Sequence, residues 1–136
     1  MSELQGSSRT DRIAKEVLFS EGRTMIPDRP DSPLSDVRIR QAISLSIDRK
    51  AINDAELGGF SPIEGNWISA EWPGALQRPV PPTDVEKAKQ LMAEAGHAGG
   101  FEVSQITPLP PNTSWAERIA SQLRAVNIKT ISVVLN

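Results

Sequence analysis

The feature that most constrains this chain is a strand–helix–strand pattern near its C-terminus. FEVSQIT, residues 101–107, alternates apolar and polar side chains as a half-buried strand does. Residues 114–126 repeat apolar side chains at helical spacing, and residues 129–135 form a second, β-branched apolar run. Short links join the three segments. This order predicts two parallel strands with a right-handed crossover, a βαβ unit.

We therefore expect an α/β fold in which a small mixed sheet carries the C-terminal βαβ unit and is packed by several helices. Two parallel strands alone are too few for a finished sheet. Either residues 1–33 add a strand, or the sheet is completed by chain that is absent from this sequence. We interpret residues 1–33 as a polar N-terminal extension with a possible short helix at 11–20 and a proline-rich linker, and residues 34–136 as the compact part.

The stretch DVRIRQAISLSIDRKAI, residues 36–52, admits two interpretations. Its middle, ISLSI, alternates like a strand. Ile39, Ala42, Ile43, Ser46 and Ile47 also fall at i, i+3, i+4, i+7 and i+8, which is the spacing of one helical face, and all but Ser46 are apolar. Ser35 is a suitable N-cap residue before this pattern. The helical interpretation accounts for more residues, so we predict a helix at 36–47.

Capping residues mark the starts of three further helices. Asp48 can cap a helix at 49–57. T-D-V-E at residues 83–86 and S-W-A-E at residues 114–117 are capping boxes, which make Thr83 and Ser114 the expected N-caps. The first of these boxes precedes a helix at 84–95.

Composition limits the classes of function. The chain has 136 residues, a formal net charge of −2, no cysteine and a single histidine, His97. The near-neutral charge argues against a nucleic-acid partner. The lack of cysteine excludes thiolate metal sites and cysteine nucleophiles, and one histidine leaves little for acid–base or metal chemistry. We expect no enzymatic activity, no cofactor and no metal, and we find no apolar signal peptide at the N-terminus of this chain.

Three stretches of the chain together resemble one protein family. They are PLSDVRIRQAISLSIDRKAI at 33–52, SPIEGNWIS with PPTDVEKAKQLMAEAGHAGGFEV at 61–103, and ITPLPPNTSWAERIASQLRAVNIKTISVVLN at 106–136. Their order and spacing resemble the family 5 extracellular solute-binding proteins, the dipeptide- and oligopeptide-binding components of bacterial ABC importers. The resemblance runs from about Ser32 to Asn136. Asn127 stands where the family usually has glycine, which predicts a left-handed backbone there.

The resemblance implies a role in transport. Members of the family are two-lobed, non-catalytic proteins of the periplasmic-binding-protein-like (type II) fold. They close over a peptide, or in some cases a nickel complex or a sugar, and deliver it to ABC permease subunits from the periplasm or the cell exterior. Because members run to several hundred residues, we expect this chain to be a lobe fragment that does not bind peptide by itself.

The best candidate for a ligand contact is the link between the first strand and the following helix. Open α/β sheets bind ligands at the carboxyl ends of their strands, and helix N-termini offer free N–H groups. We predict a cleft wall made of Pro111, Asn112, Thr113, Ser114 and Trp115. The alternative is that these residues only begin a helix.

Other polar and aromatic residues have simpler interpretations. Trp67, Trp72 and Trp115 could stack on a ligand, but large aromatics are more often packing anchors. The charged residues from Arg38 to Lys50 are expected to be solvated helix faces. A second hypothesis for the whole chain is a free-standing interaction module, such as a homodimer that covers an open sheet edge. An enzyme is the least supported, because no nucleophile–base pair is visible.

Overall fold

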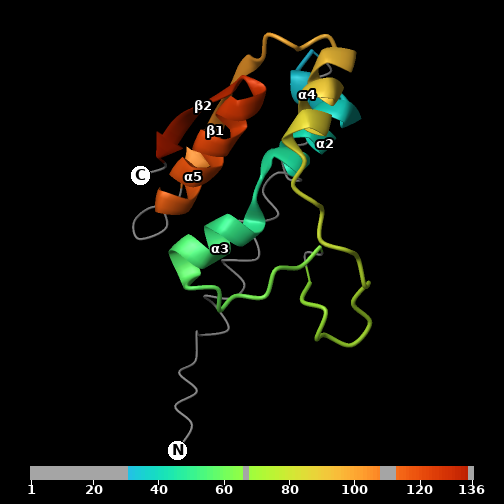
Figure 1. The fold of residues 1–136 in the computed structure, drawn as a ribbon, viewed down its shortest axis with the longest axis vertical. Helices are drawn as coiled ribbons and strands as arrows, with labels where there is room; N and C mark the ends of the chain where they lie inside the picture. The colour runs from blue at the N-terminus through green and yellow to red at the C-terminus, as the bar shows by residue number, and fades with distance from the viewer. Residues whose placement is uncertain (1–30, 66–67, 108–112, 135–136) are drawn as a thin grey trace, which may run out of the picture.

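The computed structural model describes residues 31–65, 68–107 and 113–134, so the short helix expected at 11–20 lies outside the described residues. The elements in chain order are η1 (Pro33–Ser35), α2 (Val37–Ser46), α3 (Arg49–Leu57), α4 (Val85–Glu94), β1 (Phe101–Thr107), α5 (Thr113–Leu123), η2 (Arg124–Val126) and β2 (Ile128–Val134). Figure 1 shows β1, α5 and β2 side by side and the α2–α4 pair next to them.

The C-terminal βαβ unit is confirmed. Strands β1 and β2 pair in parallel, with Phe101 opposite Ile128 and Thr107 opposite Val134. β2 begins one residue earlier than predicted, and the predicted helix divides into α5 and the 3-10 turn η2. Within the described residues the sheet holds this parallel pair alone. A strand contributed by residues 1–33, and with it the division of the chain at residue 33, stays a prediction.

The helical interpretation of residues 36–47 is confirmed, but its predicted N-cap is wrong. Ser35 lies in η1, and Asp36 is the N-cap of α2, with an extended backbone and a carboxylate that accepts the Arg38 backbone N–H at 2.8 Å. Ser32 in turn caps η1 through its hydroxyl. Ser35 and Asp36 are neighbouring residues that could each cap α2. Because Ser35 belongs to the 3-10 turn η1, Asp36 is the cap and α2 begins one residue later than predicted.

The capping boxes are also displaced. Asp84, one residue after the predicted Thr83, accepts the Lys87 backbone N–H at 2.9 Å. Thr83 instead donates its hydroxyl to the Ile47 carbonyl at 3.2 Å. Ser114 lies inside the first turn of α5, which begins at Thr113, and is therefore not its N-cap. The helices exist as predicted, whereas tertiary hydrogen bonds decide which side chain caps them. Asp48 caps α3 as expected.

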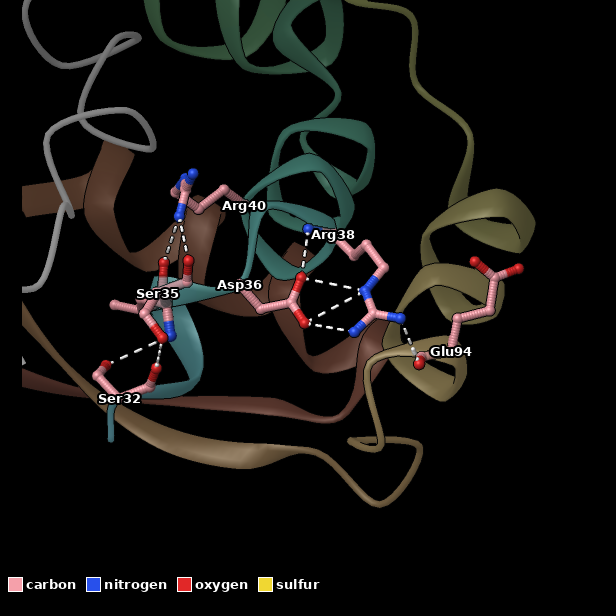
Figure 2. Close-up of polar contacts among 7 residues, drawn as sticks. Ser32, Ser35, Asp36, Arg38, Arg40 and Glu94 are labelled. Carbon is pink, nitrogen blue, oxygen red and sulfur yellow. Dashed lines mark hydrogen bonds and ion pairs between the residues drawn. The ribbon is translucent and has the colours of Figure 1, made fainter. Parts of the chain in front are cut away.

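Helices α2 and α4 pack antiparallel. At one end the Asp84 backbone N–H donates to the Leu45 carbonyl at 2.8 Å. At the other end Arg38 donates from Nη1 to the Glu94 carbonyl at 2.7 Å, while its Nε and Nη2 bind the Asp36 carboxylate (Figure 2). The two ends of the pair are thus tied by hydrogen bonds. Arg40 donates to the carbonyls of Leu34 and Ser35, and Figure 2 shows it beside Ser35.

Arg49 corrects the expectation that the charged run is solvated. It is only 8% exposed, and its guanidinium donates to the carbonyls of Ser44 and Ile47 and to the Ser44 hydroxyl. A guanidinium can be buried in this way because its planar donors meet several carbonyl acceptors at once. Arg49 therefore closes the end of α2, whose last carbonyl groups have no partner inside the helix.

The core lies between α2, α4, α5 and the start of β2. Its members are buried and apolar: Leu34, Ile39, Ala42, Ile43, Ile47, Ile52, Ala88, Leu91, Met92, Leu123, Val126 and Ile128. Helix α3 contributes Ile52 to this core and extends away from the α2–α4 pair in Figure 1. The core therefore unites the predicted helices with the βαβ unit in one packed body.

Candidate functional site

Three of the five predicted cleft-wall residues lie among those that the structure describes. Pro111 and Asn112 lie outside the described residues, whereas Thr113, Ser114 and Trp115 form the first turn of α5. Thr113 and Ser114 are half-buried, and Trp115 is only 4% exposed. The burial of Trp115 supports the packing interpretation for this residue. Trp72 differs, because 50% of it is exposed.

Helix α3 lies antiparallel to α5, so the C-terminal end of α3 lies beside the first turn of α5. The Asp48 backbone N–H, at the start of α3, donates to the Gln122 side chain of α5 at 2.9 Å. Glu56, near the end of α3, contacts Ser114 at the start of α5. Because α3 and α5 are joined at both ends, the start of α5 is held by a second helix as well as by the strand before it.

The Glu56 carboxylate binds two side chains of α5. Its Oε2 accepts the Ser114 hydroxyl at 2.7 Å, and its Oε1 accepts Nε–H of Arg118. The Glu56 side chain is 13% exposed, against 49% for Arg118. The hydrogen bond from Ser114, and then that from Arg118, lowers the pKa of Glu56 below its ordinary value. Glu56 is therefore an ionised, largely buried carboxylate beside the first turns of α5.

Glu56 was missed by the sequence reasoning, although one signal was present. It lies in the last turn of α3, where a negative charge opposes the helix dipole. A carboxylate at that position indicates a compensating partner elsewhere in the fold. Neither the identity of the partner nor its distance along the chain could be read from helical periodicity, because Ser114 lies 58 residues away.

Two other carboxylates, those of Glu64 and Asp84, serve local structure. Glu64 accepts the Ser69 hydroxyl at 3.0 Å and the Ala70 backbone N–H at 3.1 Å. Asp84 caps α4. Over residues 31–65, 68–107 and 113–134, no group of three histidine, aspartate or glutamate side chains is arranged to hold a metal ion. Among the helices of these same ranges, none has the length and apolar character that crossing a membrane requires.

A family model matches most of the chain. The model described as bacterial extracellular solute-binding proteins, family 5 Middle, aligns with residues 10–133. This match begins closer to the N-terminus than the resemblance that we traced from about Ser32. It includes every element that the structure describes up to residue 133.

Individual relatives agree with the family match. The heme-binding protein A of Haemophilus influenzae is 34% identical over 106 residues, covering 73% of this chain. The structure of AgaA from A. tumefaciens R10 in complex with agropinic acid is 33% identical, has a TM-score of 0.63 and covers 77% of this chain. DppA from Helicobacter pylori, an ABC transporter-associated periplasmic binding protein solved with the peptide STSA, covers 74% of this chain with a TM-score of 0.68 at 22% identity, which shows a shared fold.

The chain spans a small part of each of these proteins: 19% of the H. influenzae protein, 22% of the AgaA chain and 20% of the DppA chain. In the AgaA and DppA chains the matching part shares the fold of this chain, as the TM-scores of 0.63 and 0.68 show. With residues 10–133 matched by the family model and a relative at 34% identity, this chain belongs to the bacterial extracellular solute-binding proteins, family 5.

Proposed function

We propose that the chain supplies part of a solute-binding lobe in the binding component of a peptide-type ABC importer. That component captures solute and delivers it without catalysis. The observation that carries this proposal is the family match over residues 10–133, together with the shared fold of solved binding proteins. The solute would be a peptide or another small molecule, and ABC permease subunits would receive it. The place of action would be the periplasm or the cell exterior.

The proposed contact with solute is the candidate cleft wall, residues 111–115. Its support is positional: this segment follows the carboxyl end of β1 in a parallel pair, where open α/β sheets bind their ligands. Thr113 and Ser114 keep part of their surface exposed, whereas Trp115 is buried and anchors the turn. We infer that the wall meets solute through its backbone and through the side chain of Thr113.

The chain by itself is expected to bind solute weakly. One wall of a cleft buries little of a ligand, and ordering the ligand costs free energy that a single wall does not offset. Proteins with the length of the matched relatives offer further surface, since this chain spans only 19% of the H. influenzae relative. We therefore assign solute capture to a protein of that length and a supporting role to this chain.

A chimera tests the proposal. Residues 31–134 would replace the matching segment of the H. influenzae heme-binding protein A, which is 34% identical over the aligned region. We expect a folded chimera that retains heme binding, measured by absorbance titration beside the unaltered protein. A chimera that folds, by circular dichroism and thermal melting, but binds no heme would contradict the scaffold role. Calorimetric titration of the isolated chain with peptides, heme and agropinic acid then compares the solute classes.

A second candidate function is a free-standing interaction module. It is favoured by the loop at residues 60–80, where large apolar side chains are exposed: Phe60 at 92%, Ile68 at 56%, Trp72 at 50%, Leu76 at 66% and Val80 at 39%. Large apolar side chains exposed in one loop would be covered by a contact with another protein surface. Self-association in solution would support this candidate.

A further inference from the structure

We propose that Glu56 is a positioning residue for the first turn of α5, which holds Thr113, Ser114 and Trp115 of the candidate cleft wall, because its carboxylate joins the end of α3 to the first two turns of α5. We call Glu56, Ser114 and Arg118 the Glu56 clamp. That the clamped segment meets solute rests on the function proposed above. The clamp itself rests only on the contacts between α3 and α5, so the two can fail separately.

The geometry of the clamp suits this role. Ser114 and Arg118 are four residues apart on α5, so they lie on one face of the helix in successive turns. A single carboxylate accepts from both, with Oε2 at 2.7 Å from Ser114 Oγ and Oε1 bound to Nε of Arg118. Unwinding the first turn of α5 would move Ser114 away from Arg118 and break this arrangement. The carboxylate also lies near the end of α5 that the helix dipole makes positive.

Glu56 projects from a helix that is fixed at both ends. Ile52, one turn earlier, is 1% exposed in the core. The Asn53 side chain donates to the Ser61 carbonyl at 2.9 Å and accepts the Ser61 backbone N–H at 3.3 Å, which holds the chain as it leaves α3. At the start of α3, the Asp48 N–H binds Gln122. The carboxylate therefore has little freedom to follow α5 if that helix shifts.

An ion pair elsewhere on α3 shows what an ordinary surface contact looks like. Lys50 and Asp54 pair within α3, and their side chains are 78% and 51% exposed. Glu56 is 13% exposed and reaches across to another helix. Exposed pairs of the first kind contribute little to stability. Asp54 thus provides a matched control on the same helix.

Hydrogen exchange of the full 136-residue chain tests the clamp. The amides of residues 117–120 donate to the first-turn carbonyls of α5 when that turn is formed, so their exchange reports its opening. In Glu56→Ala we expect these amides to exchange roughly tenfold faster, since hydrogen bonds to a charged group are lost. Asp54→Ala should leave them unchanged. Exchange in Glu56→Ala within about twofold of wild type would overturn the proposal.

A double-mutant cycle keeps the test decisive if Glu56→Ala perturbs folding. Ser114→Ala and Arg118→Ala each remove one donor and keep the carboxylate. If the clamp acts as a unit, Glu56→Ala combined with Arg118→Ala should accelerate exchange by less than the product of the two single effects. Effects that multiply fully would show independent residues and would overturn the proposal.

The pH dependence of Trp115 quenching tests whether the negative charge of Glu56, and not only the packing of its side chain, holds the first turn of α5. In a Trp67→Phe, Trp72→Phe background, Trp115 is the remaining tryptophan and reports the first turn of α5. Arg118 is the charged group that faces Glu56 from α5, while Lys50 and Asp54 on α3 pair with each other. We expect acrylamide quenching of Trp115 to rise in acid as Glu56 is protonated, and this transition to be absent in Glu56→Gln. An unchanged transition in Glu56→Gln would assign it to another group and overturn the role of the charge.

Discussion

Two residues at the start of the sheet show how one backbone contact can restrict a sequence. Asn127 has a left-handed backbone with φ of 62°, as the sequence predicted, and its side chain donates to the Ala98 carbonyl at 3.1 Å. Gly100 has φ of 78°, and an ideal Cβ added there would lie 1.8 Å from the Asn127 carbonyl oxygen. The entry to β1 and the entry to β2 thus approach too closely for any side chain at residue 100.

Substituting Gly100 should therefore be severe. We expect Gly100→Ala to lower the free energy of unfolding by about 3 kcal/mol or more, because it adds a backbone clash to a strained φ. Gly96→Ala is the matched control: its φ is 80°, but an added Cβ would meet nothing within 4 Å. That control should cost about 1 kcal/mol, the price of the left-handed conformation alone. Equal urea midpoints for the two variants would contradict this account.

Asp36 should give the chain a specific acid sensitivity. Hydrogen bonds from the Arg38 side chain and backbone lower the pKa of Asp36 from 3.8 to about 2. A carboxyl whose pKa falls on folding stabilises the native state above its unfolded pKa and loses that contribution as the pH falls through the folded value. The stability difference between wild type and Asp36→Asn should thus be complete above about pH 4 and shrink toward pH 2.

Urea unfolding at a series of pH values measures this difference. Arg38→Gln provides the partner control, because it removes the guanidinium that donates to Asp36. It should reduce the same acid-dependent component. A difference between wild type and Asp36→Asn that stays constant from pH 5 to pH 2 would show that Asp36 does not titrate as described.

At the scale of elements, α2 and α4 form a helix pair that packs against the βαβ unit. Ile39, Ala42 and Ile43 of α2 are at most 2% exposed, as are Ala88 and Met92 of α4. The helical periodicity of residues 36–47 predicted the buried face of α2 correctly. It could not predict that α4 is the antiparallel partner, because the bonds that set this arrangement join residues far apart in sequence, such as Arg38 and Glu94.

The buried face of α2 should dominate its contribution to stability. We expect Ile39→Ala to reduce the free energy of unfolding by about 2 to 5 kcal/mol, because it removes buried methylene groups and leaves a cavity. Val37→Ala on the same helix is the control, since Val37 is 53% exposed, and it should stay within about 0.5 kcal/mol of wild type. Chemical unfolding followed by circular dichroism compares them. Similar losses in both variants would show that α2 does not pack as described.

At the scale of the whole molecule, the proposed transport role and the interaction-module alternative predict different masses in solution. As a lobe scaffold the chain should remain a monomer when it is diluted, because the α2–α4 pair and the βαβ unit bury their apolar side chains in one shared core. The exposed apolar loop at residues 60–80 would instead favour a dimer that dissociates on dilution. We expect a monomer by sedimentation equilibrium.

A loop variant tells the two outcomes apart. Phe60→Ser combined with Leu76→Ser removes the two most exposed large apolar side chains that the structure describes. If wild type is a dimer and this variant is a monomer, the loop is an interface and the interaction module is supported. If both are monomers, the loop is free for contacts with other parts of a solute-binding protein.

The place of the candidate cleft wall in the fold could be predicted from sequence, whereas the contacts of its side chains could not. The segment from Pro111 to Trp115 was located by the end of one strand pattern and the start of a helix. Its described residues do begin α5. Ser114 lies within α5 and is bound to Glu56 instead of capping the helix, and Trp115 is buried. Side-chain partners depend on which helix packs alongside, and no local pattern encodes that.

The order of helices and strands, the left-handed turn at Asn127 and the family can all be predicted from the sequence. The elements and the turn follow from side-chain periodicity and backbone preference, which act over a few neighbouring residues, and the family follows from the order and spacing of three stretches along the chain. The fold was needed to show that Asp84 rather than Thr83 is the N-cap of α4, that Arg49 is buried and that Glu56 clamps α5. These outcomes depend on packing, because a charged or hydroxyl group takes the partners that packing brings within hydrogen-bond distance.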